Sequence, residues 1–257
     1  MDKLFVVKIG GNVIENPKIL ESFLKDFAAL NGYKILIHGG GKKATEMAEK
    51  LNVAVDIIDG RRITDAANLD IITMIYGGKI NKTIVAKLQA LDCNAIGLSG
   101  ADGNSMSAVK RVIREIDYGF VGDITAINTD LFTLFLNNGL SPVCCGISHN
   151  KNGQLLNTNA DTIAAAIAKD LSKYFEVSLW YCFEKKGVLN FDKNEQNVIE
   201  YLKPETYVDL KSKGVINSGM IPKIDNCFDA LNNGVKIVKI GSPGIISGNE
   251  NHTTLIL

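Results

Sequence analysis

Two hydrophobic patterns alternate along the chain. Short runs of β-branched and other apolar residues, such as 4–9 and 34–37, end at glycines and predict buried strands. Between these two runs, Asn16 and the proline after it are typical of a helix start. The face of this helix that we expect to be buried consists of Leu20, Phe23, Leu24 and Phe27. Strands that alternate with helices predict βαβ units, and therefore an α/β fold around a mainly parallel open sheet.

The same reasoning places the remaining elements. We expect helices over 42–51, 66–91, 130–138, 160–171, 204–213 and 220–232. We expect strands over 94–98, 142–147, 175–183, 235–240 and 253–257. A hairpin is expected over 53–63 with its turn near Asp59-Gly60, and alternation over 106–124 suggests antiparallel strands around Gly119. The polar stretch 192–196 predicts a loop, and two lobes could divide near residue 175.

Bulk composition excludes several classes of protein. The 257 residues carry 28 basic and 28 acidic side chains, so no general field attracts nucleic acid or acidic lipid. The five cysteines are an odd number and form no C-x-x-C pair, which indicates reduced thiols in a cytoplasmic protein. No apolar run approaches the roughly 20 residues of a membrane span, and the first residues do not resemble a signal peptide. We therefore expect no nucleic-acid or membrane partner.

Glycines follow each of the first two predicted strands. Lys8-Ile-Gly-Gly11 ends the first strand, where open α/β sheets bind ligands and where glycine lets backbone N–H groups approach phosphate. His38-Gly-Gly-Gly41 ends the second and precedes a helix, whose N-terminus favours an anion. The plainer interpretations are a solvated strand-end lysine and a packed strand-end histidine; for His38 we favour the packed one.

Residues 39–44 also fit the relaxed G-x-G-x-x-A dinucleotide pattern, and Asp59 lies near the spacing of a ribose-binding acid. A dehydrogenase is therefore one alternative, although such a motif normally follows the first strand. The P-loop pattern G-x-x-x-x-G-K-[ST] and the protein-kinase H-R-D and D-F-G motifs are absent from the sequence. A phosphotransferase with this sequence would belong to another lineage.

Three further segments carry candidate chemistry. Arg62, in the predicted hairpin, offers a guanidinium fork for a carboxylate, although alone it would pass for a surface arginine. Asn157-Thr-Asn-Ala-Asp161 precedes a helix, so helix capping is the plain interpretation. Lys223 follows Pro222 at a predicted helix N-terminus, where a cation is disfavoured unless an anion is nearby.

Taken together, these segments resemble the amino acid kinase family, and most closely its acetylglutamate kinase branch. Five segments match in the family's order: Lys8-Ile-Gly-Gly11, His38-Gly-Gly-Gly41, Gly60-Arg-Arg-Ile-Thr64, Asn157-Thr-Asn-Ala-Asp161 and Gly219-Met-Ile-Pro-Lys223. The resemblance implies a three-layer αβα sandwich. It also implies a lobe over 1–174 that binds the acylated amino acid and dimerises, and a lobe over 175–257 that binds ATP.

The resemblance also implies a role for each matching residue. Lys8 and Lys223 would stabilise the transferring phosphoryl group, and Asp161 would organise them. The substrate would be bound by Gly40, Gly41, Arg62 and Asn157. The phosphates and the nucleotide would be bound by Gly10, Gly11, Glu184, Lys185, Lys186, Gly187, Val188, Leu189, Val215, Ile216 and Asn217. Magnesium would be held mainly by the ATP phosphates, with no metal site made by side chains.

The implied reaction moves the γ-phosphoryl group of ATP onto the side-chain carboxylate of an N-acylated glutamate, in arginine biosynthesis. An ionised carboxylate needs no general base, so lysines, glycines and one aspartate suffice. The sequence departs from the family at Cys182-Phe-Glu184, where Thr/Ser-Asp is usual. This variant is similar to forms from Bacteroidetes-type bacteria, so the acyl group could be acetyl or succinyl.

Arginine-inhibited relatives carry an extra N-terminal helix, for which the sequence before Leu4 leaves no room. We therefore expect no arginine feedback, and a homodimer. The alternatives are kinases of the same family that act on carbamate, aspartate, glutamate or UMP. Two more distant alternatives are the dehydrogenase and a ligand-binding sensor that has kept the fold without catalysis.

Overall fold

The computed structural model describes residues 1–58, 60–192, 195–216, 220–248 and 250–257. The chain forms two compact units, which we call the terminal unit (Met1–Lys34 with Ala164–Leu257) and the central unit (Ile35–Ile163). This division differs from the expected boundary near 175, because the first strand pairs with a strand of the C-terminal segment. The assignment of functions to lobes over 1–174 and 175–257 stays a prediction.

The terminal unit contains five strands in the order β14-β16-β15-β11-β1. Their bounds are Tyr201–Leu202, Thr253–Leu255, Ile237–Gly241, Glu176–Cys182 and Lys3–Ile9. β1 pairs with β11 in parallel from Lys3↔Glu176 to Ile9↔Cys182, and β11 pairs with β15 in parallel. Only the β15–β16 pair is antiparallel among these four pairings. The C-terminal ends of β1, β11 and β15 therefore meet at one edge, where open α/β sheets bind ligands.

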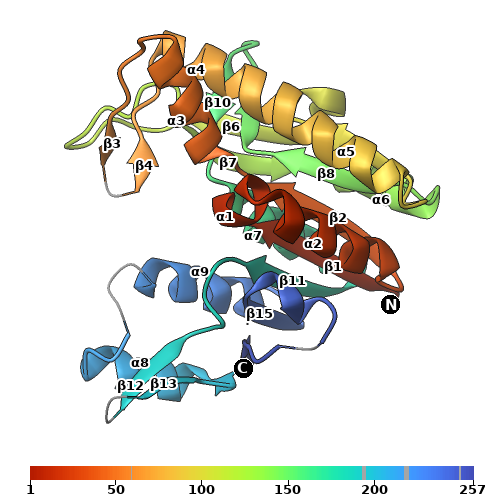
Figure 1. Cartoon of the computed structure of the whole chain (residues 1–257), viewed down its shortest axis with the longest axis vertical. Helices are drawn as coiled ribbons and strands as arrows, with labels where there is room; N and C mark the ends of the chain where they lie inside the picture. Colours follow the sequence, from red (N-terminus) through yellow and green to blue (C-terminus); the bar gives the residue numbers. More distant parts are fainter. Residues whose placement is uncertain (59, 193–194, 217–219, 249) are drawn as a thin grey trace. The chain divides into compact units, whose positions relative to one another are not determined.

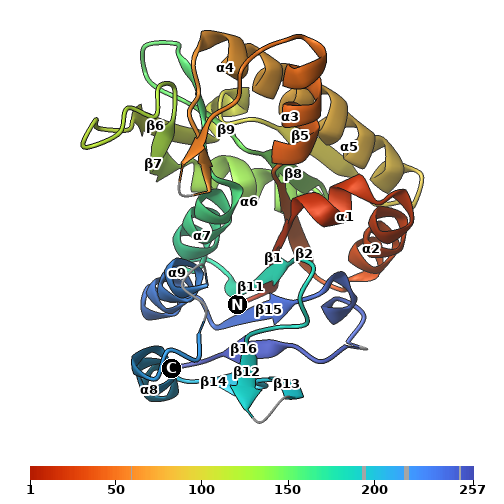
Figure 2. The same ribbon diagram turned by 60° about the vertical axis from the view of Figure 1, so that its left-hand side comes forward.

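Helices lie on either side of these strands, with α9 on one side of β11 and β15 and α2 on the other (Figure 2). The helices are α1 (Gly11–Glu15), α2 (Pro17–Ala29), α7 (Ala160–Leu171), α8 (Pro204–Ser212) and α9 (Ile221–Asn232). Asn16 caps α2 as predicted, because its side chain accepts hydrogen bonds from the backbone N–H groups of Lys18 and Ile19. The buried face of α2 consists of the four predicted residues, Leu20, Phe23, Leu24 and Phe27.

One predicted loop was wrong. Over 192–196 we expected a polar loop, but β12 (Leu189–Asp192) and β13 (Glu195–Val198) form an antiparallel pair. The pairing runs from Leu189↔Val198 to Asp192↔Glu195, and residues 193–194 of the predicted loop lie outside the described residues. A polar hairpin of this kind is held by backbone hydrogen bonds and leaves little hydrophobic pattern to detect.

The central unit contains a parallel group of strands and a second, mainly antiparallel sheet. β2 (Tyr33–His38), β8 (Ser141–Cys145) and β5 (Ala95–Leu98) pair in parallel in that order. The second sheet has the order β10-β9-β6-β7, formed by Leu155–Asn157, Ile147–His149, Met106–Lys110 and Gly122–Ile127. The expected hairpin is present as β3 (Ile57–Ile58) with β4 (Arg61–Arg62). Asp59, in its expected turn, lies outside the described residues.

The central helices are α3 (Gly41–Lys50), α4 (Ala66–Ile72), α5 (Asn81–Gln89) and α6 (Thr129–Asn137). The long helix predicted over 66–91 is present, but its middle, η1 (Thr73–Ile80), is a π-helix that contains Gly77 and Gly78. In Figure 2, α5 and α6 lie on opposite sides of β8. In Figure 1, the second sheet and the β3–β4 hairpin lie at one end of the central unit, and α6 lies at the opposite end.

An α/β fold with a mainly parallel sheet, as predicted, is confirmed. Within the described part of the chain, no helix is both long and apolar enough to cross a membrane.

Candidate active site

Two of the predicted catalytic lysines lie beside the same tyrosine of the terminal unit. Lys8 pairs in register with Tyr181 across β1 and β11, so the two side chains leave the sheet on the same face. The Lys223 ammonium lies 5.5 Å from the centre of the Tyr181 ring and 5.2 Å from that of Phe183. The structure therefore brings together two lysines that are 215 positions apart in the sequence, at the C-terminal ends of the parallel strands.

Gly10 and Gly11 connect β1 to α1 at the same edge. The N–H of Gly10 donates to the carbonyl of Cys182 at 3.0 Å, which continues the β1–β11 pairing to the end of β11. Gly11 begins α1, so its N–H is one of the groups that a helix start leaves without an intrahelical partner. Asn12, in α1, donates to the carboxylate of Glu184, which places the start of the predicted nucleotide segment beside the glycines.

The rest of the nucleotide segment combines exposed and buried residues. Glu184, Lys185 and Lys186 are exposed, whereas Val188 and Ile216 are 2% and 5% exposed. Gly187 has a φ of +156° and lies against Thr253 of β16, whose hydroxyl accepts a hydrogen bond from the N–H of Val188 at 2.8 Å. Leu189 begins β12, and the N–H of Val215 donates to the carbonyl of Leu210. Asn217 lies outside the described residues.

Arg62 forms the centre of the predicted substrate site in the central unit. It is only 8% exposed, and its Nη2 donates to the Gly41 carbonyl at 2.9 Å and to the Thr45 hydroxyl at 2.6 Å. Its Nη1 donates to Asn68 Oδ1 at 3.3 Å. Arg62 is therefore not a surface arginine. Its guanidinium lies against the start of α3, and the hydrogen bonds to α3 and α4 fix the orientation of its plane.

Asn157 reaches the same segment through Thr64. Its Nδ2 donates to the Thr64 hydroxyl at 3.0 Å, and that hydroxyl donates to the carbonyl of Arg62 at 3.1 Å. Backbone pairing also connects the segment around Thr64 with the segment around Asn157. Thr64 pairs with Gly119, and Val121 pairs with Asn157, both in parallel. Arg62 and Asn157 are therefore held on one small framework, as a shared substrate site requires.

The glycine loop between β2 and α3 is packed rather than open. A Cβ on Gly40 would lie 2.3 Å from Ile80 Cδ1 and 3.0 Å from the Tyr76 ring, so a larger residue here would require these side chains to shift. Ile80 and Tyr76 come from the π-helix η1. Burial raises the pKa of Tyr76, and the nearby Arg62 guanidinium opposes that rise. Tyr76 thus lies close to the predicted substrate residues, although its helical pattern gave no sign of it.

His38 is a packed strand-end histidine, as predicted. Asn81, which directly follows η1, donates through Nδ2 to His38 Nε2 at 3.1 Å and to the Val143 carbonyl at 2.9 Å. His38 Nε2 therefore accepts, and Nδ1–H donates to the Gly39 carbonyl at 2.8 Å. Complete burial lowers the pKa of His38 to about 4, which keeps the ring neutral near pH 7.

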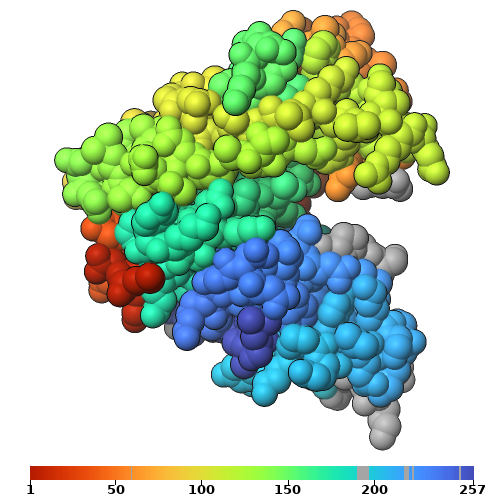
Figure 3. Space-filling view, turned by 180° about the vertical axis from the view of Figure 1, so that it is seen from behind, coloured from red at the N-terminus to blue at the C-terminus, as the bar shows by residue number. Residues whose placement is uncertain are grey.

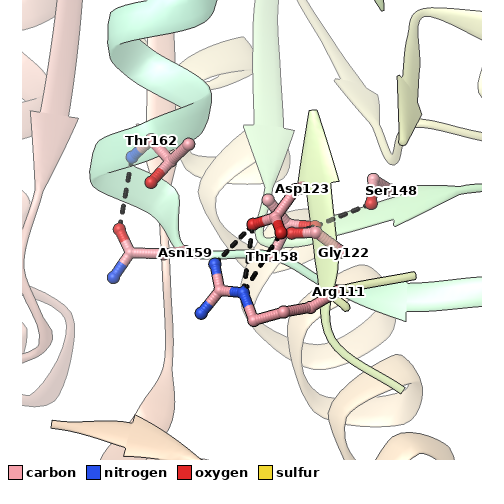
Figure 4. Close-up of polar contacts among 7 residues, drawn as sticks. All are labelled: Arg111, Gly122, Asp123, Ser148, Thr158, Asn159 and Thr162. Atoms are coloured by element: carbon pink, nitrogen blue, oxygen red, sulfur yellow. Dashed lines mark hydrogen bonds and ion pairs between the residues drawn. The ribbon is translucent and has the colours of Figure 1, made fainter. Parts of the chain in front are cut away.

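Asp161 stands in the first turn of α7. The carboxamide oxygen of Asn159 accepts from the N–H groups of Asp161 and Thr162 at 2.7 and 3.2 Å, and Figure 4 shows the contact with Thr162. Asn159 therefore caps the helix, whereas the side chain of Asn157 donates to Thr64. Capping explains only Asn159 among the four polar residues of this motif.

The comparison with family models defines the class of protein, a family of phosphotransferases. The model of the amino acid kinase family matches residues 3–242, and the chain belongs to this family. The resemblance inferred from the five segments is confirmed. Membership of this family replaces the dehydrogenase interpretation of residues 39–44.

Several curated relatives that match over most of the chain are named acetylglutamate kinase. The acetylglutamate kinase of Cytophaga hutchinsonii is 54% identical over 241 residues, which cover 93% of this chain and 91% of that protein. The acetylglutamate kinase of Bacteroides thetaiotaomicron is 47% identical over 249 residues, or 97% of each chain.

Solved structures show the same fold. The Streptococcus mutans protein smu.665 is 26% identical with a TM-score of 0.80, covering 99% of this chain and 98% of that one. The carbamate kinase of Giardia lamblia bound to AMP-PNP is 14% identical with a TM-score of 0.69, covering 99% and 98%, and shows the fold alone.

Proposed function

We propose that the chain transfers the γ-phosphoryl group of ATP to the side-chain carboxylate of an N-acyl-L-glutamate, in arginine biosynthesis. The observation that carries the proposal is the family match over 3–242 together with relatives named acetylglutamate kinase that are 46–54% identical over most of the chain. A kinase of this family needs an acceptor site, a cationic phosphate site and a nucleotide site, and each has candidate residues here.

The acceptor is bound by Gly40, Gly41, Arg62 and Asn157. Arg62 pairs with the α-carboxylate of the substrate, because a guanidinium forms directed, charge-assisted hydrogen bonds with carboxylates. Asn157 offers an amide that both donates and accepts, which suits the polar N-acyl linkage. The fixed orientation of Arg62 on Gly41 and Thr45 supports this role, since a pre-oriented donor loses little freedom on binding.

Lys8 and Lys223 stabilise the negative charge of the phosphoryl group in transit, Asp161 organises these lysines, and the N–H groups of Gly10 and Gly11 contact phosphate. Phosphoryl transfer depends on positioning and charge stabilisation more than on covalent help. The acceptor carboxylate is already ionised near neutral pH, so it attacks the γ-phosphorus directly and ADP departs with the bridging oxygen. The position of both lysines beside Tyr181 supports a joint action.

ATP is bound by residues 184–189 and 215–217, which belong to the terminal unit. Magnesium, when bound, neutralises phosphate charge, and it is held mainly by the phosphates themselves, as is common for this ion. The glycines at the end of β1 fit phosphate because they bring backbone N–H groups close without a side chain between.

The protein is proposed to act in the cytoplasm as a homodimer. Its five cysteines are all free and buried, and burial raises the pKa of Cys145 to about 12, which suits a reducing compartment.

An acceptor panel tests the reaction. The purified chain is given ATP with Mg²⁺ and, in turn, N-acetyl-L-glutamate, carbamate, aspartate, glutamate and UMP, and ADP release is followed. Hydroxylamine added to parallel reactions converts an acyl phosphate into a hydroxamate, which identifies the phosphorylated group. We expect turnover and hydroxamate with the N-acylated glutamate; turnover with another acceptor alone would overturn the proposal.

A further inference from the structure

The backbone of the glycine loop, residues 39–41, is held at each of its three carbonyl groups. The Gly40 carbonyl accepts from the N–H of Ala44 at 3.0 Å, a hydrogen bond of the first turn of α3. The Gly41 carbonyl accepts from Arg62 Nη2 at 2.9 Å. The third carbonyl, at the start of the loop, is bound by the side chain of the residue before it.

His38, the last residue of β2, makes this third hydrogen bond. Its Nδ1–H donates to the Gly39 carbonyl at 2.8 Å. In a planar trans peptide unit, the C=O of one residue and the N–H of the next residue point in opposite directions. The hydrogen bond from His38 therefore also sets the direction of the Gly40 N–H, which belongs to a residue of the proposed acceptor site.

Asn81 determines which nitrogen of His38 carries the proton. The Nδ2 of Asn81 lies 2.9 Å from the Val143 carbonyl oxygen and 3.1 Å from His38 Nε2. A carbonyl oxygen only accepts hydrogen bonds, so the amide nitrogen of Asn81, and not its oxygen, must face Val143. The same nitrogen donates to His38 Nε2, which leaves the proton of the neutral ring on Nδ1. Asn81 thus selects the neutral tautomer that can bind the Gly39 carbonyl.

The carboxamide of Asn81 is buried although one of its atoms is not satisfied. Asn81 is 1% exposed, and its Oδ1 has no hydrogen-bond partner among the described residues. This oxygen lies against β5, where a Cβ on Gly97 would come within 2.0 Å of it. A buried amide oxygen without a partner is destabilising, so the carboxamide is not explained by its own packing. The two hydrogen bonds that Nδ2 donates do explain it.

His38 is enclosed by protein and is not itself a ligand-binding group. The yellow-green atoms on the surface of the central unit in Figure 3 belong to residues from the middle of the chain, whereas His38 has no exposed surface. Burial lowers the pKa of the ring to about 4, so the ring stays neutral near pH 7. A neutral, enclosed ring neither pairs with a charged substrate nor exchanges protons with it. An effect of His38 on the reaction must therefore pass through the glycine loop.

We propose that His38 is a positioning residue of the acceptor site: held by Asn81, it fixes the Gly39–Gly40 peptide so that the Gly40 N–H donates to the acceptor carboxylate. The glycine loop leads into the ten-residue helix α3, whose N-terminus favours such an anion. A donor that is fixed in advance loses little freedom when the acceptor binds. This inference rests on the proposed function, which assigns Gly40 to the acceptor, and it adds two buried residues that act through the loop.

Two substitutions separate the two hydrogen bonds of His38. In His38→Asn, the carboxamide takes the position of Nδ1 and can still donate to the Gly39 carbonyl, but it no longer reaches Asn81. In His38→Gln, the longer side chain carries its carboxamide to the position of Nε2, so it keeps the contact with Asn81 and loses the one with Gly39. Each variant therefore loses one hydrogen bond, and only His38→Gln releases the glycine loop.

Steady-state kinetics at saturating ATP compare these variants, with N-acetyl-L-glutamate or N-succinyl-L-glutamate as acceptor, whichever the wild type turns over faster. We expect His38→Gln to lower kcat/KM for the acceptor about 10- to 100-fold, mainly through KM, as one hydrogen bond to a carboxylate is lost. His38→Asn should restore kcat/KM to within about 3-fold of the wild type. The KM for ATP should stay within about twofold in both variants.

A second histidine of the central unit provides the control. His149 is partly buried, and its ring nitrogens contact the Asn150 carbonyl and Asn104 Oδ1 instead of the glycine loop. His149→Gln should leave kcat/KM for the acceptor and KM for ATP unchanged.

Nuclear magnetic resonance measures the tautomer independently of turnover. The chain has three histidines, and the ring nitrogen signals of His38 are those that disappear in either His38 variant. Near pH 7 we expect a neutral ring with its proton on Nδ1. In Asn81→Ala, which removes the donor to Nε2, this preference should weaken, and kcat/KM for the acceptor should fall with it.

A proton on Nε2 in the wild type would overturn the inference, and so would wild-type kcat/KM for the acceptor in folded His38→Gln. An equal loss in His38→Asn and His38→Gln would make His38 structural and would overturn it as well. If His38→Gln does not fold, the wild-type tautomer and Asn81→Ala decide the question. No turnover of the wild type with either acceptor would refute the proposed function itself, whereas turnover that does not depend on His38 refutes only this inference.

Discussion

The two units differ in the cations that they offer to anionic ligands. In the terminal unit, the candidate cations at the phosphate site are lysines, and this unit contains no arginine in its sequence. In the central unit, the cation at the proposed acceptor site is Arg62. Lysine is a compact, mobile charge, whereas arginine is a planar fork with fixed donor directions. The difference matches the tasks: a phosphoryl group moves during the reaction, but the α-carboxylate that orients the acceptor does not.

The two kinds of cation are also held differently. Arg62 is fixed by the Gly41 carbonyl, the Thr45 hydroxyl and Asn68, and Arg111 is fixed by Asp123. Lys223 instead lies over two aromatic rings, Tyr181 and Phe183. A ring face attracts a cation without prescribing one hydrogen-bond direction. The hydrogen bonds of the Arg62 guanidinium, in contrast, fix the directions of its donors.

The strongest test of this contrast removes the mobile charges. Lys8→Ala and Lys223→Ala should each retain the fold and lower kcat about 10²- to 10³-fold, because each deletes a group that stabilises charge in the transition state. Lys3→Ala, at the opposite end of β1 and exposed, is the matched control and should keep wild-type turnover. Wild-type-like turnover in either of the first two variants would remove that lysine from the mechanism.

Acidification tests how far the central unit depends on its buried polar groups. The pKa of His38 is lowered from 6.5 to about 4 in the fold, so the unfolded chain binds the extra proton first as the pH falls. Stability is therefore complete above pH 6.5 and is lost progressively toward pH 4, by about 3 kcal/mol in total. Urea titrations from pH 7.5 to 4.5 measure this slope. His38→Asn, which cannot titrate, should flatten it; an unchanged slope would show that another group is responsible.

The substitution Arg62→Lys tests whether binding of the acceptor needs the planar guanidinium group or only a positive charge. The variant keeps the positive charge but cannot reproduce the two-nitrogen contact with Gly41, Thr45 and Asn68. We expect KM for the N-acylated glutamate to rise about 10- to 100-fold, with a smaller change in kcat, as one directed charge-assisted hydrogen bond is lost. Steady-state kinetics with the acceptor varied give both constants. A KM within twofold of the wild type would show that charge alone suffices.

Much of the fold could be predicted because local patterns are strong where elements bury one face. The helices α2 and α7, and the hairpin that carries Arg62, follow from caps, prolines and apolar spacing. The association of β1 with β11 could not be predicted from local patterns, because residues about 170 positions apart pair only in the folded chain. The β12–β13 hairpin was missed because its sequence is mostly polar and has little hydrophobic alternation.

The residues of the candidate site could likewise be predicted only in part. Glycine, lysine and arginine motifs marked Gly40, Lys8 and Arg62 directly in the sequence. Tyr76 and Asn81 gave no such signal. Tyr76 lies in the π-helix against Gly40, Asn81 follows the π-helix and donates to His38, and no residue type demands either contact.

The smallest changes in stability that we predict come from removing one helix cap in each unit. The Asn16 side chain caps α2 in the terminal unit, and the Asp65 carboxylate caps α4 in the central unit by accepting from the N–H of Asn68 at 2.8 Å. Asn16→Ala and Asp65→Ala should each lower the free energy of unfolding by about 1 kcal/mol at pH 7. Only the second should depend on pH, because hydrogen bonds from the Asn68 backbone and side chain lower the pKa of Asp65 from 3.8.

The lowered pKa of Asp65 determines how its contribution to stability changes with pH. A carboxylate with a lowered pKa stabilises the fold fully above pH 3.8 and loses this contribution as the pH falls through its folded pKa. Urea titrations at pH 7, and at a pH below 3.8 at which the wild type still unfolds cooperatively, compare both variants. The cost of Asp65→Ala should shrink at the lower pH, while that of Asn16→Ala should persist, because a carboxamide does not titrate. A cost of Asp65→Ala that is equal at both pH values would mean that the Asp65 side chain stabilises α4 without its charge.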